Sequence, residues 1–558
     1  MTVNTTNSVA EFDTNGVNTL ADLRAVNSAL NNRAATLGYA ARGDGGHGEY
    51  AVDEADTTST ESIPMIIVAN DGARWKLIHD GNVSAEQCGF KRDGTVNTQD
   101  ILNSAIVAVT AAGASISWGY GTYVCEHIEL IPNMSWIGKG PFFTILKAKN
   151  GLNLDFISSN FTINTNNVSV VGMQFDGNRA NNTSGHTFAL KGAKQYLRQI
   201  TITQSAYHGL ITDFDIIDGE RPLGFESAYE DILIDTTGRH GWRYDGPTDS
   251  SMTNITLLDC GVSADNSWFG LVASRNFRAN NLHPWNRSST SNTPAASVYI
   301  LASAPGCTAV NSHFEGGHCP LKILSNQNAF TDCDYYAPRG AYCLENYGTA
   351  NKISGVLGAA AASVNPNYRG ILMGGTGNMV DLTDGGCVNG SIDFTNSQGG
   401  NFVRISGYRS SGVPFVGTPH PTDDVLLVIR GAGGGEISQA YSAQFSVFPA
   451  TVSAQDGNFS DATGTMRFRR VGKVVFIQLM VTIGASGVST ATGNISVVLP
   501  YSCAAFPYQL SGCDMVSGLS IQGRIIPGGS SVRIFKNDNS SAIANGTTLS
   551  LNGWYEAA

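Results

Sequence analysis

Residues 200–203 read Ile-Thr-Ile-Thr, and the same alternation returns as Ile-Leu-Ile-Asp at 232–235 and Ile-Thr-Leu-Leu at 255–258. Apolar side chains at every second position are typical of a β-strand that buries one face. Gly, Asn or Asp follows each segment and interrupts it. A strand with one apolar face cannot bury that face alone, so neighbouring turns of the chain must stack and share one core. The three segments therefore predict successive rungs of a solenoid.

Segments of the same kind continue on both sides, at residues 171–175, 281–285, 311–315 and 332–336. They follow one another at intervals typical of solenoid repeats, whose periods are roughly 20 to 50 residues. Helical spacing is nearly absent in this region, and β-branched residues are frequent in the strands. We therefore expect an all-β protein built around a right-handed parallel β-helix.

The composition of the chain agrees with this fold and limits its partners. At 558 residues it is too long for one globule, and 64 glycines supply the turns of a β protein. The net charge of −11 argues against nonspecific binding to nucleic acid or to anionic membranes, which require a basic surface. No apolar stretch is long enough for insertion into a bilayer, and the first residues lack the features of a secretory signal.

The ten cysteines form neither a CxxC pair nor a metal-ligand spacing. Cys260, Cys307, Cys333 and Cys387 stand beside predicted strands, where a thiol packs as a small apolar group. We expect free, buried thiols, as in a protein made in a reducing cytoplasm.

Four regions follow one another along the chain. Residues 1–18 are polar and predict a tether, and residues 19–82 predict a small domain whose first helix is capped by Thr19. Residues 83–412 are assigned to the β-helix, opened by an amphipathic helix after Thr98 that would cap its first coil. A Pro-rich joint then leads to residues 421–558, where discrete strands predict an antiparallel β-sandwich.

Three segments near the start of the chain carry a family resemblance: residues 20–75, Gly-Phe-Lys-Arg-Asp-Gly-Thr at 89–95 with the helix after it, and Gly-Tyr-Gly-Thr-Tyr at 119–123. With the domain order of nearly the whole chain, they resemble bacteriophage tailspikes, which have a pectate-lyase-like β-helix and degrade bacterial surface polysaccharide. The resemblance implies a homotrimer, a capsule or O-antigen substrate, and hydrolase or lyase chemistry. It also implies a protein made in the host cytoplasm that acts outside the cell from the virion tail, attached directly or through an adaptor protein.

Alternation assigns an inward and an outward face to each strand. The residues expected inside are Ile200, Ile202, Ile232, Ile234, Ile255, Leu257 and Leu282. Stacking the strands predicts a first outward column of Gln174, Thr203, Asp235, Leu258, His283, His313 and Asp334. The second outward column is predicted to be Asp176, Ser205, Thr237, Cys260, Trp285, Glu315 and Tyr336. A slip of one residue in this alignment would turn every side chain to the other face.

One patch of these columns combines acid–base groups with aromatic rings on three consecutive coils. Its residues are His283, Trp285, His313, Glu315, Asp334 and Tyr336. Rungs about 4.8 Å apart bring these groups within the width of a sugar, and a glycan site needs a ring to stack on and groups that move protons. A trimer interface and an ordinary solvated surface remain alternatives for the same patch.

The expected roles divide this site into two sets. The candidate catalytic residues are Glu315, Asp334, His313 and His283. The candidate substrate-binding residues are Trp285, Tyr336, Arg287, Asp235, Arg243 and Asp245. No metal or other cofactor is predicted, because no His or Asp spacing matches an EF-hand or a zinc site.

Three functions compete for these residues. Hydrolysis would use Glu315 as acid and Asp334 as base or nucleophile, and a carboxyl separation of about 5 Å or of about 6.5–9.5 Å would indicate retention or inversion. β-Elimination on a uronic acid would use His313 or Tyr336 as base, with Arg287 neutralising the carboxylate. A receptor-binding fibre would grip the glycan without cutting it.

Other charged residues flank the same coils. Carboxylates that compete for the catalytic roles are Glu226, Glu230, Asp245, Asp249 and Asp265, and the acidic loop 215–226 could wall a groove. Arginine replaces lysine between Lys194 and Lys322, at Arg198, Arg221, Arg239, Arg243, Arg275, Arg278 and Arg287. Guanidinium groups suit an acidic sugar, but they equally suit ties between turns of neighbouring coils.

Overall fold

The computed structural model describes residues 15–213, 226–262, 269–285, 296–336, 339–358, 368–387, 389–408, 415–417, 419–420, 422–430, 436–439, 446–471 and 473–558. No helix within these residues is both long and apolar enough to cross a membrane. The chain divides into two compact units. The first unit extends to Leu344, and the second begins at Glu345.

The first unit opens with a small five-stranded sheet in the order β1-β2-β3-β5-β4. Its elements are β1 (Asn15–Val17), α1 (Leu20–Leu23), β2 (Arg33–Thr36), β3 (Gly48–Val52), β4 (Ile66–Val68) and β5 (Arg74–Leu77). Thr19 caps α1 as predicted, because its hydroxyl accepts from Asp22 N while the Asp22 carboxylate accepts from Thr19 N. β1 pairs with β2, so the sheet includes residues that the sequence assigned to a tether. Residues 1–14 lie outside the described part.

Helix α2 (Gln99–Ala111) begins after Thr98 and lies at the start of the β-helix. Its buried face, which includes Leu102, Ile106 and Val109, packs against β7 and β9 of the first coil. The first coil strands are β6 (Asn82–Ser84), β7 (Ser115–Ser117), β8 (Gly121–Cys125) and β9 (Ile128–Leu130). This arrangement covers apolar side chains that a terminal coil would otherwise expose.

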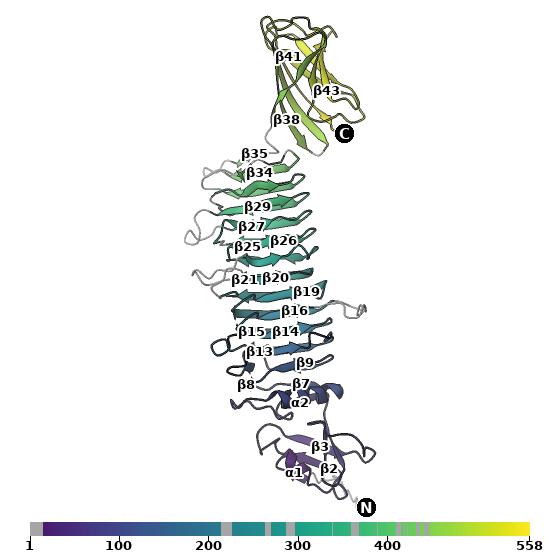
Figure 1. Cartoon of the computed structure of the whole chain (residues 1–558), viewed down its shortest axis with the longest axis vertical. Coiled ribbons are helices and arrows are strands. Elements are labelled where there is room, and N and C mark those ends of the chain that lie inside the picture. Colours follow the sequence, from purple (N-terminus) through teal and green to yellow (C-terminus); the bar gives the residue numbers. More distant parts are fainter. Residues whose placement is uncertain are drawn as a thin grey trace, which may run out of the picture. The chain divides into compact units, whose positions relative to one another are not determined.

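The coils of the first unit stack as successive rungs of two parallel sheets (Figure 1). One sheet contains β10 (Ser135–Ile137), β11 (Thr144–Ala148), β13 (Ser169–Asp176), β15 (Tyr196–Ser205), β17 (Ala228–Thr237), β19 (Ser250–Leu258), β21 (Phe277–Trp285), β23 (Thr308–Val310), β24 (His313–Glu315) and β26 (Ala329–Tyr336). The other contains β12 (Ile157–Ser159), β14 (Phe188–Lys191), β16 (Leu210–Asp213), β18 (Trp242–Asp245), β20 (Phe269–Ala273), β22 (Ala296–Ile300) and β25 (Cys319–Ile323), after β9. The parallel β-helix predicted from the alternation is confirmed.

A ladder of left-handed residues bends the first of these sheets at one level on successive coils. Its members are Gln199, Asp231, Asn254, Asn281, Asn311 and Asp332, all with positive φ. Asn and Asp adopt this conformation more readily than most residues. Their side chains also bond along the ladder, since Asn254 Nδ2 donates to Asp231 Oδ1 at 2.8 Å and Asn281 Nδ2 to Asn254 Oδ1 at 3.0 Å. The ladder fixes the register of the residues that follow it.

The core fills the space inside the coils with the predicted side chains. All seven residues expected inside, from Ile200 to Leu282, are buried, and Ile232 pairs with both Ile200 and Ile255 on the adjacent rungs. Larger aromatic side chains such as Trp242 and Tyr229 complete the packing. All ten cysteines are thiols, as expected, and nine of them are buried.

The second unit begins within β27 (Tyr342–Asn346) and has parallel coil strands followed by an antiparallel domain. Its coil strands are β28 (Lys352–Leu357), β29 (Arg369–Gly375), β30 (Met379–Asp384), β31 (Ile392–Ser397), β32 (Phe402–Tyr408), β33 (Phe415–Val416) and β34 (Asp424–Arg430), with β35 (Glu436–Gln439) antiparallel to β34. Parallel pairing between β32 and β34 therefore extends past residue 412, the predicted end of the coils.

The C-terminal domain is a nine-stranded antiparallel sheet in the order β36-β38-β39-β44-β41-β42-β43-β40-β37. Its strands are β36 (Ser446–Ala450), β37 (Val452–Asp456), β38 (Ala462–Val471), β39 (Val474–Ile483), β40 (Thr492–Val498), β41 (Tyr508–Asp514), β42 (Ser520–Ile525), β43 (Ser531–Lys536) and β44 (Thr548–Glu556). Alternate residues such as Ile477, Val532 and Leu551 share one core. This is the predicted antiparallel domain, but its first strand begins at Ser446 rather than near residue 421.

Candidate functional site

Three adjacent strands position the predicted patch: β21, β24 and β26. β21 and β26 contain a residue of the left-handed ladder, and β24 begins two residues after one. In each coil the residue after the ladder turns inward, as the buried Leu282 shows in β21. The following residue therefore points outward. β24 and β26 pair in register, with His313 beside Asp334 and Glu315 beside Tyr336. The predicted convergence of these outward residues on consecutive coils is present in the structure.

The predicted columns are wrong by two residues on the coils of β15, β17 and β19. In the structure, the column of His283 continues through Thr256, Leu233 and Thr201 on those rungs. The column of Trp285 continues through Leu258, Asp235, Thr203 and Asp176. The residues Ser205, Thr237 and Cys260, which were expected to point outward, are buried. Alternation has a period of two, so it does not distinguish registers that differ by two residues, and only the left-handed ladder fixes the correct one.

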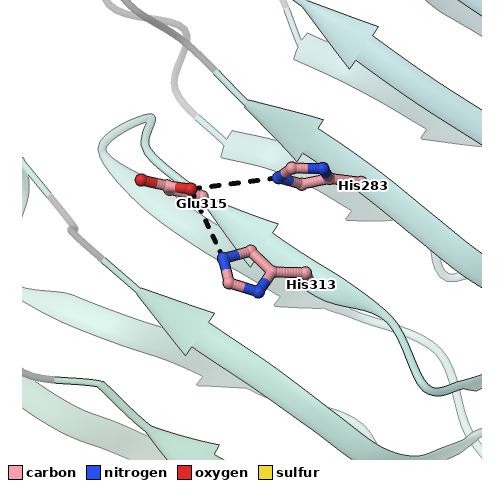
Figure 2. A group of neighbouring side chains, drawn as sticks. All are labelled: His283, His313 and Glu315. Atoms are coloured by element: carbon pink, nitrogen blue, oxygen red, sulfur yellow. Dashed lines mark ion pairs between the residues drawn. The ribbon is translucent and has the colours of Figure 1, made fainter.

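The centre of the site is a cluster of His283, His313 and Glu315. Figure 2 shows that these side chains come from two neighbouring coils and point toward one another. Glu315 Oε2 lies 3.3 Å from His313 Nε2 and 3.9 Å from His283 Nε2. The two imidazole rings meet edge to face, with their centroids 4.9 Å apart. All three side chains are about one-third exposed, so a solute can reach them while the strand backbone holds them in place.

Asp334 and two aromatic rings surround this cluster. Asp334 Oδ2 lies 3.6 Å from His313 Nδ1, so the imidazole of His313 faces a carboxylate through each nitrogen. The ring of Tyr336 is 4.7 Å from that of His313, and the exposed ring of Trp285 is nearly parallel to that of His283. The site therefore has acid–base groups at its centre and aromatic surfaces at two edges.

The electrostatic environment differs between the groups of the site. Burial lowers the pKa of His283, the neighbouring His313 lowers it further, and Glu315 partly opposes both. His283 is therefore a neutral imidazole at neutral pH. Burial also raises the pKa of Tyr336, and the carboxylates of Asp334 and Glu315 act in the same direction. A neutral Tyr336 can donate a hydrogen bond to a sugar hydroxyl.

The remaining predicted binding residues do not all join this patch. Asp235 lies on the same face as Trp285, two rungs away with Leu258 between them. Arg243 and Asp245 lie on β18 in the other sheet, where they form an ion pair of 2.5 Å with each other. They were assigned to the site because the sequence does not show which sheet a short strand enters. Arg287 lies outside the described residues.

Several competing charges have structural partners instead. Glu230 pairs with Arg198 at 3.6 Å and Asp249 with Arg278 at 3.5 Å, each between adjacent coils. Arg239 stacks over the ring of Tyr207 at 3.8 Å, and Arg275 Nη1 donates to Ser274 O at 3.2 Å. These contacts give the arginine bias a structural explanation at four positions. Glu226 lies just before β17, where its backbone oxygen accepts from Lys194 N at 3.2 Å, and Asp265, Arg221 and most of the acidic loop 215–226 lie outside the described residues.

A second histidine cluster was not predicted. His186, His208 and His240 stack on three successive turns, with ring centroids 4.9 and 4.7 Å apart, and Phe269 continues the stack. His208 Nδ1 accepts from His240 N, and His240 Nδ1 accepts from Phe269 N. These bonds require unprotonated Nδ1 atoms, so the stack joins neighbouring turns only while the rings are neutral. The available signal was a His two residues before the strands that begin at Phe188, Leu210 and Trp242.

Acid is expected to weaken the fold through this stack. Burial, with nearby His and Arg charges, lowers the pKa of His208 to about 2 and that of His240 to about 4, below the value of about 6.5 in an unfolded chain. The unfolded state therefore binds more protons than the folded state does at acidic pH. The contribution of the stack to the free energy of unfolding is complete above pH 6.5 and declines as the pH falls toward 4. Each imidazole contributes a slope of up to about 1.4 kcal/mol per pH unit.

Urea unfolding at pH 7.5 and pH 5 measures this slope. His208→Asn is expected to reduce it, because the Asn amide oxygen can accept the bond from His240 N but cannot be protonated there. His318→Asn, at an exposed position outside the stack, is the control and should keep the wild-type slope. Equal slopes for His208→Asn and wild type would contradict the role of the stack.

Comparison with known proteins agrees with this architecture. Residues 16–80 match the family described as the phage tail protein small four-stranded beta-sheet domain. The crystal structure of the Dettilon tailspike protein gp208 superposes with a TM-score of 0.50 at 12% identity, covering 86% of this chain and 95% of that one. The tailspike gp49 of Acinetobacter baumannii bacteriophage Fri1, a capsular polysaccharide depolymerase, is 12% identical, with 98% of each chain covered and a TM-score of 0.44. No curated protein matches the sequence.

These findings define the class of the protein at the level of domain and fold. The chain carries a phage tail β-sheet domain at residues 16–80, followed by a parallel β-helix of the tailspike fold. The resemblance drawn from the sequence is therefore confirmed.

Proposed function

We propose that this protein is a phage tailspike that recognises and depolymerises a bacterial surface polysaccharide, a capsule or an O-antigen. The observation that carries the proposal is the patch around His313, where two carboxylates and two imidazoles lie between the rings of Trp285 and Tyr336. The phage tail β-sheet domain supports a place in the virion tail. Synthesis in the host cytoplasm and attachment to a tail or adaptor protein belong to the same proposal.

Hydrolysis is the chemistry that these groups support best. Glu315 would protonate the leaving oxygen and Asp334 would activate water, with His313 holding both carboxylates in position. Glu315 pairs with Tyr336, so Glu315 and Asp334 are diagonal neighbours, and their positions lie roughly 8 Å apart by the spacings of a parallel sheet. Side chains that leave the sheet at that separation suit the carboxyl distance of about 6.5–9.5 Å in inverting glycosidases better than the distance of about 5 Å in retaining ones. We therefore favour inversion.

The reaction products distinguish this mechanism from its alternatives. Digestion of the host polysaccharide should release new reducing ends without the ultraviolet absorbance of an unsaturated sugar. An increase in that absorbance would instead indicate β-elimination, with His313 or Tyr336 as base. Binding of the polysaccharide without any new chain ends would indicate a receptor fibre.

The assembly is proposed to be a homotrimer, since a cyclic arrangement closes a long, outward-facing flank of coils. Light scattering of the full chain tests it, and a monomer at micromolar concentration would refute it.

The C-terminal domain would aid trimerisation or bind glycan. A hollow of about 320 Å³ supports glycan binding, since Arg524 and Arg533 lie opposite each other there on β42 and β43, beside Phe535. Loss of polysaccharide affinity in Arg533→Ala would test that role.

Trp285→Ala is expected to weaken substrate binding more than it slows turnover. The ring is exposed at the edge of the patch and carries no proton to the reaction, so it would act as a stacking surface. Aromatic stacking contributes roughly 0.5–1.5 kcal/mol, so we expect KM to increase by up to about tenfold with little change in kcat. Phe161→Ala is the matched control, because this aromatic ring is as exposed as that of Trp285 but lies on a coil outside the patch. A fall in kcat with an unchanged KM would assign Trp285 a different role.

A further inference from the structure

The cluster of His283, His313 and Glu315 has the geometry of a partly assembled metal site. The ligand atoms of the three side chains all lie within 4.8 Å of one another. With metal–ligand bonds of about 2.0–2.2 Å, the ligands of a tetrahedral zinc ion are about 3.4 Å apart. His313 Nε2 and Glu315 Oε2 already lie at 3.3 Å, and Glu315 Oε2 and His283 Nε2 at 3.9 Å. Small side-chain rotations would complete the set.

An unpaired buried atom points to a ligand at this position. His283 Nε2 is shielded from solvent and has no hydrogen-bond partner, because its distance to Glu315 is too long for a hydrogen bond. A buried polar atom without a partner is costly, and a bound ion is one of the few arrangements that would satisfy it. The backbone on either side of His283 is held by the buried Leu282 and Pro284, so the ring is presented from a rigid strand.

Asp334 would orient one of the ligands. Its Oδ2 is 3.6 Å from His313 Nδ1, on the side of the ring opposite Glu315. A proton on Nδ1 that faces this carboxylate leaves the lone pair of Nε2 free for a metal. Carboxylates in this outer position are a regular feature of histidine–zinc sites. The same four residues therefore supply both the ligands and their support.

We propose that His283, His313 and Glu315 bind one divalent transition metal ion of the zinc class, with a fourth position open to solvent. Two imidazoles and one carboxylate suit zinc, whereas calcium and magnesium prefer six or more oxygen ligands. Sequence spacing predicted no metal, because His283 comes from a different coil than His313 and Glu315. If the proposed hydrolytic function holds, the ion competes with it, since a metal-bound Glu315 carboxylate cannot donate the proton.

Calorimetric titration of the full chain with Zn²⁺ tests the site without an activity assay. We expect one ion per chain. His283→Ala and Glu315→Gln should each weaken binding by more than about 100-fold, and Asp334→Asn by about 10- to 100-fold, the usual cost of losing an outer-shell partner. His318→Ala, an exposed His on the coil of Glu315, should bind like wild type. Absence of stoichiometric binding, or wild-type affinity in His283→Ala, would refute the site.

Polysaccharide digestion tests the competition separately. Zn²⁺ should inhibit the wild type, and a chelator should leave its activity unchanged or raise it. Loss of activity on chelation would overturn the competition, because the ion would then be required. An absence of cleavage under every condition would refute the proposed function, while the titration would still decide whether the metal site exists.

Discussion

Glu315→Gln is expected to abolish depolymerisation while leaving the fold intact. Loss of a general acid costs roughly 10²- to 10⁴-fold in rate, and glutamine cannot supply the proton. Glu315 lies at the centre of the patch, 3.3 Å from His313, and its side chain is about one-third exposed. Its removal therefore leaves no buried charge without a partner, and the free energy of unfolding should change by less than about 1 kcal/mol. Release of reducing ends and urea unfolding measure the two effects.

Glu230→Gln is the matched control for this experiment. Glu230 is also an outward carboxylate on a nearby coil, but its partner is Arg198 at 3.6 Å rather than the His cluster. Its replacement should leave activity near wild type. If Glu315→Gln cleaved polysaccharide at the wild-type rate, the acid would lie elsewhere, and Glu226 and Asp245 would be the next candidates.

The sequence predicted the patch because its three strands share a local pattern. The pattern begins with a left-handed Asn or Asp, which a buried residue and then an outward residue follow. It starts at Asn281, at Asn311 and at Asp332. Alternation then determines which side chains face outward. The rungs of β15, β17 and β19 were misaligned by two residues because alternation has a period of two and therefore looks the same after such a slip. Only the left-handed corners at Gln199, Asp231 and Asn254 distinguish the two registers.

Contacts that depend on turns escaped prediction for a different reason. Turn residues have no alternation, so neither the stack of His186, His208 and His240 nor the separation of Arg243 from the patch follows from strand periodicity. The cluster of His283, His313 and Glu315, which we propose binds a metal, was not recognised as a possible metal site because a spacing motif describes ligands on one segment. A solenoid instead joins ligands from different coils, and their sequence separation then depends on loop length.

Trp242→Ala is expected to cause the largest loss of stability among these substitutions. The indole is fully buried, meets Tyr229 and Tyr244 edge to face at 5.0 and 5.9 Å, and donates from Nε1 to Thr212 Oγ1 at 3.0 Å. Replacement of a buried Trp by Ala typically costs about 3–5 kcal/mol, because the lost burial leaves a cavity. The loss of the donor to Thr212 adds to this cost.

Urea unfolding of Trp242→Ala measures this loss, and Arg243→Ala provides the control from the next position of the same strand. Arg243 points outward, with about half of its side chain exposed, and its ion pair with Asp245 is a surface pair, so its replacement should cost less than about 1 kcal/mol. A solenoid rung contacts only its neighbours, so the damage should begin at the rungs of β16, β18 and β20. A decrease of less than about 1 kcal/mol in the free energy of unfolding of Trp242→Ala would show that these rungs collapse into the cavity. The rigidity of the coils that carry the patch would then not depend on this aromatic core.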